Sequence, residues 1–294
     1  MKYMSAKEAA AVWNLSERSI QEYCMQGRIG GAVLHGNTWN IPAASQKPVR
    51  NSKETASSPL LGILRREKES QFMGGIYHRL QIDMTYHSNR IAENRLTHEQ
   101  TQYLFETKQI YIADRAVRVD DIVEAVNHFN CIDLVIEQAS SGVSEQFIKE
   151  LHRALKIGTT DAYKDWFFVG NYKSFSNTGS PLPSSSPEYV SQKMKELLDT
   201  YRTASPKRLE DILEFYMRFE AIKPFQSGNG RVGRLLMLSE CLRNGIVPFI
   251  LFKDMKPSYH HGLSIWHQER SVLRDICLEA QHHFQSIMEH FSIV

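Results

Sequence analysis

A glycine-rich loop in the C-terminal half of the chain carries the side chains with the clearest potential for chemistry. Gly228, Asn229 and Gly230 stand directly before Arg231 and Arg234, two arginines that lie three residues apart on one predicted helix face. The first turn of a helix offers free N–H groups and the positive end of the helix dipole, and both attract anions. Glycines allow a ligand to approach the backbone closely. The loop is therefore predicted to bind a phosphate group.

Two helical patterns flank this loop and would position it. Upstream, apolar residues recur at helical spacing from Leu209 to Phe219, and Pro224 discourages continuation of that helix. Downstream, a largely apolar helix begins near Val232 and can end at Gly245. A simple solvated turn is the alternative interpretation. The coincidence of glycines, a helix start and two arginines on one face favours the anion site.

The same segment resembles the signature of Fic domains, His-x-Phe-x-Asp/Glu-Gly-Asn-Gly-Arg-x-x-Arg. The matching positions are Phe225, Gly228, Asn229, Gly230, Arg231 and Arg234. The resemblance extends from about residue 75 to the C-terminus, and it implies a mainly α-helical core that transfers AMP from ATP to protein hydroxyls. Two positions depart from the signature. Lys223 replaces the histidine that acts as the base, and Ser227 replaces the acid that holds Mg²⁺.

These two departures change the expected chemistry. Histidine titrates near neutrality, whereas neutralising an ordinary lysine at pH 7 costs roughly 4–5 kcal/mol. Burial and neighbouring arginines would reduce that cost, so a base at Lys223 is handicapped rather than excluded. The uncharged hydroxyl of Ser227 cannot replace a carboxylate as a Mg²⁺ ligand, so no metal site is predicted. The loop is expected to bind ATP or another nucleotide, with Mg²⁺ binding in doubt.

Residues 80–95 resemble the inhibitory helix that precedes the core of many Fic proteins. In the family, a glutamate of this helix pairs with the second signature arginine and blocks productive ATP binding. Here that glutamate falls at Ala92, and Glu93 takes the following glycine position. Neighbours on a helix point about 100° apart, so Glu93 is expected to be a surface acid that does not substitute for the missing glutamate.

An aromatic and β-branched run at residues 166–175 surrounds a Gly-Asn pair. This composition predicts a β-hairpin. Its place in the chain resembles that of the Fic flap, which aligns a target peptide by strand addition. The residues assigned to the flap are Val169, Gly170, Asn171 and Tyr172.

Residues 1–42 predict a small winged helix-turn-helix domain. A helix over 5–13 and another from Ser16 to about residue 26 precede a hairpin with a Gly-Asn turn. This order resembles the MerR and excisionase modules, which implies binding of double-stranded DNA with the second helix in the major groove. The residues predicted to contact DNA are Arg18, Ser19, Gln21 and Arg28. A small protein-docking module is the alternative interpretation.

Composition bounds the remaining possibilities. The chain has 294 residues, of which 42% are hydrophobic and 23% charged, with a net charge of +2 that gives no overall attraction to nucleic acid. Four scattered cysteines, no signal peptide and no long uncharged apolar run predict a cytoplasmic protein that does not engage membranes. Residues 43–59 are predicted to be a linker and residues 60–294 the Fic-type domain. A homodimer would present two half-sites to DNA.

Two functions from different classes follow from these patterns. The favoured one is a nucleotide-binding pseudoenzyme of Fic fold that passes a signal to an N-terminal DNA-binding module and so regulates transcription. The alternative is an active transferase that moves AMP, or another phosphate-containing group, from a nucleotide to hydroxyls of a protein target or of itself, with Lys223 as the catalytic group. A docking scaffold without a ligand is a third and weaker interpretation.

Overall fold

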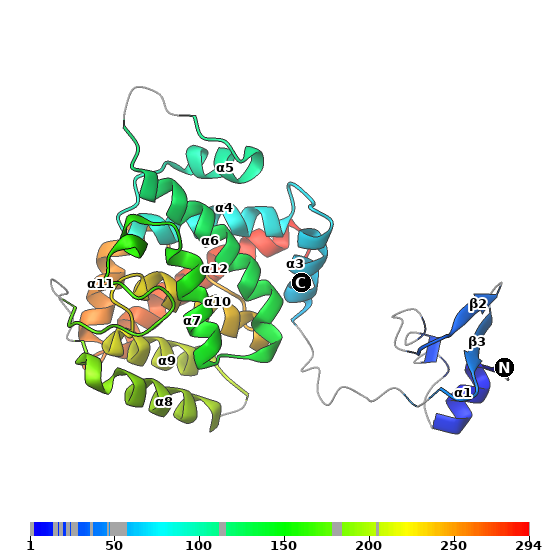
Figure 1. Ribbon diagram of the computed structural model, residues 1–294. Helices are drawn as coiled ribbons and strands as arrows, with labels where there is room; N and C mark the ends of the chain where they lie inside the picture. The colour runs from blue at the N-terminus through cyan, green and yellow to red at the C-terminus, as the bar shows by residue number, and fades with distance from the viewer. Residues whose placement is uncertain are drawn as a thin grey trace. The chain divides into compact units, whose positions relative to one another are not determined.

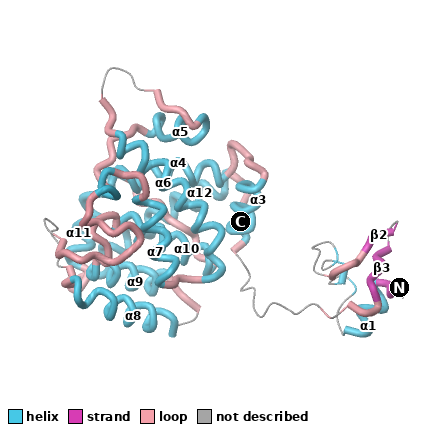
Figure 2. Tube along the Cα trace, in the orientation of Figure 1, coloured by secondary structure: helices cyan, strands magenta, loops and turns pink. Residues whose placement is uncertain are grey.

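The computed structural model divides into two compact units, Met1–Glu54 and Thr55–Val294. The residues that the structure describes are 3–13, 17, 20–21, 24, 29–35, 38–45, 47, 58–111, 116–177, 184–203 and 206–293. Among them, every strand belongs to the first unit, and the second unit is built of helices and loops (Figures 1 and 2). The prediction of a mainly α-helical fold is confirmed.

The first unit combines helix α1 (Ala6–Trp13) with a three-stranded antiparallel sheet of order β1-β3-β2. Strands β2 (Val33–His35) and β3 (Thr38–Pro42) form the predicted wing. Strand β1 (Tyr3–Ser5) was not predicted, and it pairs with β3 so that Met4 lies opposite Ile41. A small apolar core joins these elements. Its buried members are Ala6, Ala9, Trp13, Ile20, Cys24, Ile29 and Ile41.

The predicted second helix of this unit is described only in part. Glu17, Ile20, Gln21 and Cys24 have helical backbones, and Ile20 and Cys24 are buried in the core. Gln21 is half-buried. Arg18, Ser19 and Arg28, three of the four residues predicted to contact DNA, lie outside the described residues. The assignment of a helix-turn-helix therefore stays a prediction.

The second unit is a helical bundle in which one helix is central. The bounds of its helices are α3 (Pro59–Glu69), α4 (Ile76–Ile91), α5 (His98–Thr107), α6 (Val119–Gln138), α7 (Glu145–Lys156), α8 (Pro187–Thr203), α9 (Leu209–Ile222), α10 (Asn229–Asn244), α11 (Lys256–Ile265) and α12 (Arg270–His290). Three short 3₁₀ helices join them at Ala139–Ser141, Thr160–Tyr163 and Lys253–Met255. Helix α10 packs against α3, α4, α6, α7 and α9, which explains why its apolar residues surround its axis (Figure 1).

The loop between α9 and α10 has well-defined ends. Lys223 adopts a left-handed conformation with φ 46°, and Pro224 then prevents further helix. Gly228 begins α10 with φ 83°, a conformation that favours glycine. Gly233 allows the two helices to approach closely, because a Cβ at that position would lie 2.4 Å from Cε2 of Tyr216. The loop is thus held between two tightly packed helices.

The predicted β-hairpin at residues 166–175 is wrong, because this segment consists of turns and irregular backbone. The Asn171 N–H donates to the Phe168 carbonyl, so the Gly-Asn pair makes a local turn instead of joining two strands. Packing accounts for one of its aromatic residues: the Phe167 side chain is buried, and the Lys156 amine lies 5.5 Å from its ring centroid, whereas Trp166, Phe168 and Phe175 are exposed. The segment nevertheless contacts the signature loop, since the Lys173 N–H donates to the Pro224 carbonyl at 2.8 Å.

Candidate functional site

The signature loop is closed by one side chain. Oδ1 of Asn229 accepts a hydrogen bond from the Phe225 N–H at 2.9 Å, and Nδ2 of Asn229 donates to the Phe225 carbonyl at 2.8 Å. Phe225 is fully buried. The loop therefore closes between Phe225 and Asn229, and the chain continues directly into the first turn of α10. The backbone N–H groups of that turn have no partner within the helix.

His152 of α7 ties the loop to the segment at 166–175. Its Nε2–H donates to the Ser227 carbonyl at 3.2 Å, its Nδ1 accepts from the Gly170 N–H at 2.9 Å, and its ring stacks on Phe225 with centroids 3.9 Å apart. Burial, assisted by the Lys156 charge, lowers the pKa of His152 to about 3. The ring is therefore neutral and both of its nitrogens form hydrogen bonds. We call His152 the bracket, because it joins the loop to the segment at 166–175.

The predicted flap residues lie beside this bracket. Gly170 has φ 77° and provides the N–H that His152 binds, and Asn171 completes the turn. Tyr172 packs with its ring centroid 5.9 Å from that of Phe225, and the Lys149 amine lies 4.3 Å from its ring centroid. Val169 is half-buried. Gly170, through His152, and Tyr172, through Phe225, connect this segment to the loop, and the segment forms a turn rather than a strand edge.

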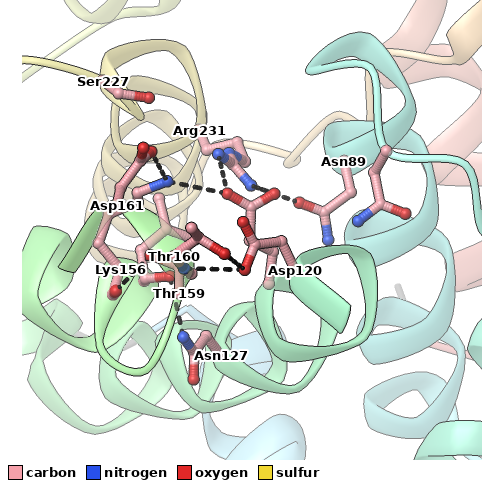
Figure 3. A network of polar contacts seen from close by, with 12 residues as sticks. Asn89, Asp120, Asn127, Lys156, Thr159, Thr160, Asp161, Ser227 and Arg231 are labelled. Atoms are coloured by element: carbon pink, nitrogen blue, oxygen red, sulfur yellow. Dashed lines mark hydrogen bonds and ion pairs between the residues drawn. The ribbon is translucent and has the colours of Figure 1, made fainter. Parts of the chain in front are cut away.

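Arg231 is neutralised by an acid of another helix. Nη1 and Nη2 of Arg231 approach the two carboxylate oxygens of Glu124 in α6 at 2.6 and 2.8 Å, and Nη1 also donates to Oδ1 of Asn89 at 3.2 Å. Glu124 accepts a further bond from the Lys156 amine, which also pairs with Asp161 at 2.9 Å. Figure 3 shows Arg231 between Asn89 and this chain of charges.

The pKa of Glu124 decides which form its carboxyl group takes in this network. Burial by itself would raise the pKa of Glu124, but the hydrogen bonds and charges of Arg231 and Lys156 lower it to about 2. Glu124 is thus ionised at neutral pH. The paired carboxylate and guanidinium form a bidentate contact of the strong kind. Neither Glu124 nor Lys156 was predicted as a site residue, and their contacts join parts of the chain that no local pattern connects.

Arg234 has partners of a different kind. Its Nε donates to Oγ of Ser88 at 3.0 Å and its Nη2 donates to the Ser88 carbonyl at 2.9 Å, and the side chain is buried. These oxygens are uncharged, and none of the ion pairs between described residues includes Arg234. Helix α4 therefore contacts both signature arginines, through Ser88 and Asn89.

Residues 92 and 93 lie away from these contacts. Ala92 ends α4, and Glu93 follows in a left-handed conformation with φ 70°. The Glu93 side chain is 82% exposed and pairs with Lys256, and this hydrogen bond and charge lower the pKa of Glu93. An acid at 93 does not reach Arg234 in this structure, which agrees with its expected place on the surface.

A buried carboxyl group lies under the loop. Oε1 of Glu220 has no hydrogen-bond partner, and a Cβ on Gly230 would lie only 3.6 Å from it. Burial raises the pKa of Glu220, against the opposing charges of Arg234 and Lys223. The sequence analysis missed this residue, although a glutamate within the apolar stretch Phe219-Glu220-Ala221-Ile222 was a visible signal.

Comparison with known proteins identifies the class of domain. Residues 142–241 match the model of the Fic/DOC family, and this range contains α7, α8, α9 and most of α10 with the signature loop. This part of the chain is therefore similar to Fic/DOC domains.

Individual relatives are more distant. The chain is 27% identical over 181 residues to "Protein adenylyltransferase Fic" of Nematostella vectensis, an alignment that covers 60% of this chain and 41% of that protein. It is 26% identical over 187 residues to "Protein adenylyltransferase fic-1" of Caenorhabditis elegans, covering 61% and 35%. The chain thus spans well under half the length of these curated relatives.

Solved structures support the fold. A Fic-domain-containing signalling protein from Bacteroides thetaiotaomicron superposes with a TM-score of 0.61 at 21% identity and covers 78% of this chain and 94% of that one. Fic-1 from C. elegans gives a TM-score of 0.59 at 22% identity, covering 78% and 69%. At such identities the likeness concerns the fold alone.

The described residues show neither a metal-ligand cluster nor a membrane-spanning helix. No three His, Cys, Asp or Glu side chains in the described ranges gather into a group that could hold a metal ion. None of the helices that the structure describes is long and apolar enough to cross a membrane.

Proposed function

We propose that the Fic/DOC domain binds a nucleotide, or another phosphate ligand, at the loop of residues 228–234, and that Arg234 rather than Arg231 is its main cationic partner. The observation that carries this proposal is that Arg234, a buried guanidinium, forms no ion pair among the described residues and donates to the neutral oxygens of Ser88. Its charge also acts on the buried carboxyl group of Glu220. The first turn of α10 adds N–H donors on the same side of the loop. ATP is the nucleotide of choice because the named relatives are adenylyltransferases.

The donor set does not fit a carboxylate-held Mg²⁺. Ser227 contributes a hydroxyl where the Fic signature has an acid, and its carbonyl is engaged by His152. Glu220 is buried beneath the loop, and burial raises its pKa against the charges of Arg234 and Lys223. We therefore derive no step through a metal, and binding that does not depend on Mg²⁺ is the expected behaviour.

Calorimetric titration with ATP, ADP and AMP, each with and without Mg²⁺, tests this proposal directly. Saturable binding that persists in the presence of a chelator supports it. Binding that requires Mg²⁺ would show that the domain holds the metal by groups other than those assigned. No binding of any nucleotide, or of phosphate, would leave only the scaffold interpretation.

We propose further that the first unit binds DNA and that the protein regulates transcription in this way. The first unit has the wing and the small core expected of a helix-turn-helix module, and this supports a role in binding double-stranded DNA. An electrophoretic shift of promoter fragments at low salt, including the fragment upstream of its own gene, tests that role. Changing Arg18 and Gln21 to Ala should abolish sequence preference. Absence of any shift with the intact chain would remove the DNA-binding part of the proposal.

The second candidate function is an active transferase that moves AMP to protein hydroxyls. It is favoured by one observation: Lys173 provides a second, buried amine close to Lys223, so a neutral amine is within reach near pH 8. The double variant K223H/S227D separates the two functions, because it returns a base that titrates near neutrality and a carboxylate for Mg²⁺. If labelled AMP from ATP appears on this variant and not on the wild type, the wild type is a binding protein. Equal labelling of both would establish the transferase.

A further inference from the structure

Lys173 holds the loop by contacts with the backbone on either side of Lys223. Its N–H donates to the Pro224 carbonyl at 2.8 Å, and its amine donates to Oδ1 of Asn177 at 2.5 Å and to the Ile222 carbonyl at 3.4 Å. The amide of Asn177 in turn donates to the carbonyls of Phe225 and Gln226 at 3.1 and 2.9 Å. The backbone on both sides of Lys223 is therefore held by this pair of side chains.

The surroundings of the Lys173 amine suit its neutral form. An ammonium group has three donors to satisfy, whereas a neutral amine has two. The two acceptors around the Lys173 amine, on Asn177 and Ile222, match the smaller number and are both uncharged. Burial lowers the pKa of Lys173, and the charge of Lys223 lowers it further, to about 8.

Several charged side chains lie on the elements around this amine. They include Glu145, Lys149 and Arg153 of α7, Lys193 and Glu196 of α8, Glu220 of α9, and Lys223, which follows α9. Lys149 lies over the ring of Tyr172, and Lys193 donates to the Ser185 hydroxyl. The charges that act on Glu220 are those of Arg234 and Lys223. Lys223 is the charged group that shifts the pKa of Lys173.

We propose that Lys173 is a positioning residue of the signature loop that takes up one proton from solvent when a phosphate ligand binds beside Lys223. This inference rests on the proposed binding of nucleotide at the loop. A phosphate near Lys223 brings negative charge that offsets the lysine's charge, so the ammonium form of Lys173 becomes more favourable. The clamp on Ile222, Pro224 and Asn177 keeps the amine close enough to respond.

The pH window follows from the lowered pKa. Below about pH 7, Lys173 is already protonated in the free protein, so binding takes up little additional proton. Above about pH 8, the free protein has lost this proton and the ligand must restore it, so affinity falls as pH rises. With one linked proton, the dissociation constant rises by at most about tenfold per pH unit.

The test is calorimetric titration of the full chain with ATP and with inorganic pyrophosphate between pH 6.5 and 9.5, in pairs of buffers that differ in ionisation enthalpy. The wild type is expected to take up almost no proton at the acid end and close to one near pH 9. In K173R the side chain keeps its donors and its charge throughout this range. K173R should bind as well at pH 9 as at pH 7 and take up no proton. The exposed Lys195, changed to Arg, is the matched control and should behave as the wild type does.

The outcomes are distinguishable. Binding by the wild type without proton uptake overturns this inference and leaves the proposed function intact, and so does an unchanged uptake in K173R. No binding of either ligand at any pH overturns both. If K173R unfolds, K223M provides the second measurement, because removing the charge that acts on Lys173 should move the uptake to higher pH. An unmoved window in K223M would also overturn the inference.

Discussion

Arg231 and Arg234 lie one helical turn apart on α10 and have equivalent places in a sequence motif, yet their surroundings differ in kind. Arg231 faces the carboxylate of Glu124, and the pair continues into Lys156 and Asp161. Arg234 faces a serine hydroxyl and a backbone carbonyl. The first arginine is therefore part of the folded framework, whereas the second forms no ion pair within the described part of the chain and acts on the buried Glu220 carboxyl only through its charge. A motif identifies residue types, but their partners decide which of them remains available to a ligand.

The largest expected effect is a loss of stability on breaking the ion pair between Glu124 and Arg231. The change E124Q removes the carboxylate and leaves the buried Arg231 and Lys156 with only Asp161 as an acid. Loss of one partner of a buried ion pair costs about 3–5 kcal/mol of unfolding free energy. Urea unfolding followed by circular dichroism measures it.

The matched control for E124Q is E137Q. Glu137 pairs with Lys68 at the surface, where its side chain is 53% exposed, and such pairs contribute at most about 1 kcal/mol. Similar losses in E124Q and E137Q would show that the Arg231 pair is not a structural contact.

On the ligand side, R234A is expected to weaken nucleotide binding by about 1.5–3 kcal/mol, the usual contribution of a hydrogen bond to a charged group. Isothermal titration with ATP measures the loss. The control is R218A, which changes an α9 arginine that is 51% exposed and paired with Glu214. R218A should bind as the wild type does. If R231A, measured under conditions where it is folded, loses more affinity than R234A, the division of roles between the two arginines is wrong.

A smaller effect is expected from S88A. The variant removes the hydroxyl that accepts from Nε of Arg234 but keeps the backbone carbonyl, so the unfolding free energy should fall by about 1 kcal/mol. Because one contact that competes for Arg234 is lost, nucleotide binding should be unchanged or tighter. Weaker binding in S88A would mean that Ser88 itself contacts the ligand.

The pH dependence of stability sharpens the comparison further. The folded-state pKa of Glu124 is lowered to about 2, so its ionised form stabilises the fold fully above the unfolded value near 4.5. That contribution is lost as pH falls through the folded value. The difference in unfolding free energy between the wild type and E124Q should therefore be constant above about pH 5 and shrink between pH 5 and pH 2. A difference that persists at pH 2 would point to packing rather than charge.

Local signals in the sequence accounted for much of this architecture. Pro224, Gly228 and Gly245 stand where α9 ends and where α10 begins and ends, because backbone restrictions of proline and glycine act within a few residues. Such local signals could not predict the partners of the two arginines. Glu124 lies 107 residues from Arg231, and Ser88 lies 146 residues from Arg234. Only the packing of α4 and α6 against α10 brings them together.

The segment at 166–175 shows how composition can mislead. Aromatic and β-branched residues favour strands when neighbouring strands can pair with them. Here Phe167 is drawn into the packing around α7, and the Gly170 N–H is bound by His152 instead of by a neighbouring strand. The composition therefore predicted a hairpin where the chain forms a turn.

The contact at Gly233 has a mechanical consequence. Because the Tyr216 ring occupies the space where a Cβ of residue 233 would stand, α9 and α10 are in close contact on both sides of the loop that joins them in the chain. A ligand that moves the two arginines of α10 would therefore change their contacts with Ser88 and Asn89 of α4 and with Glu124 of α6, and we expect those two helices to respond first.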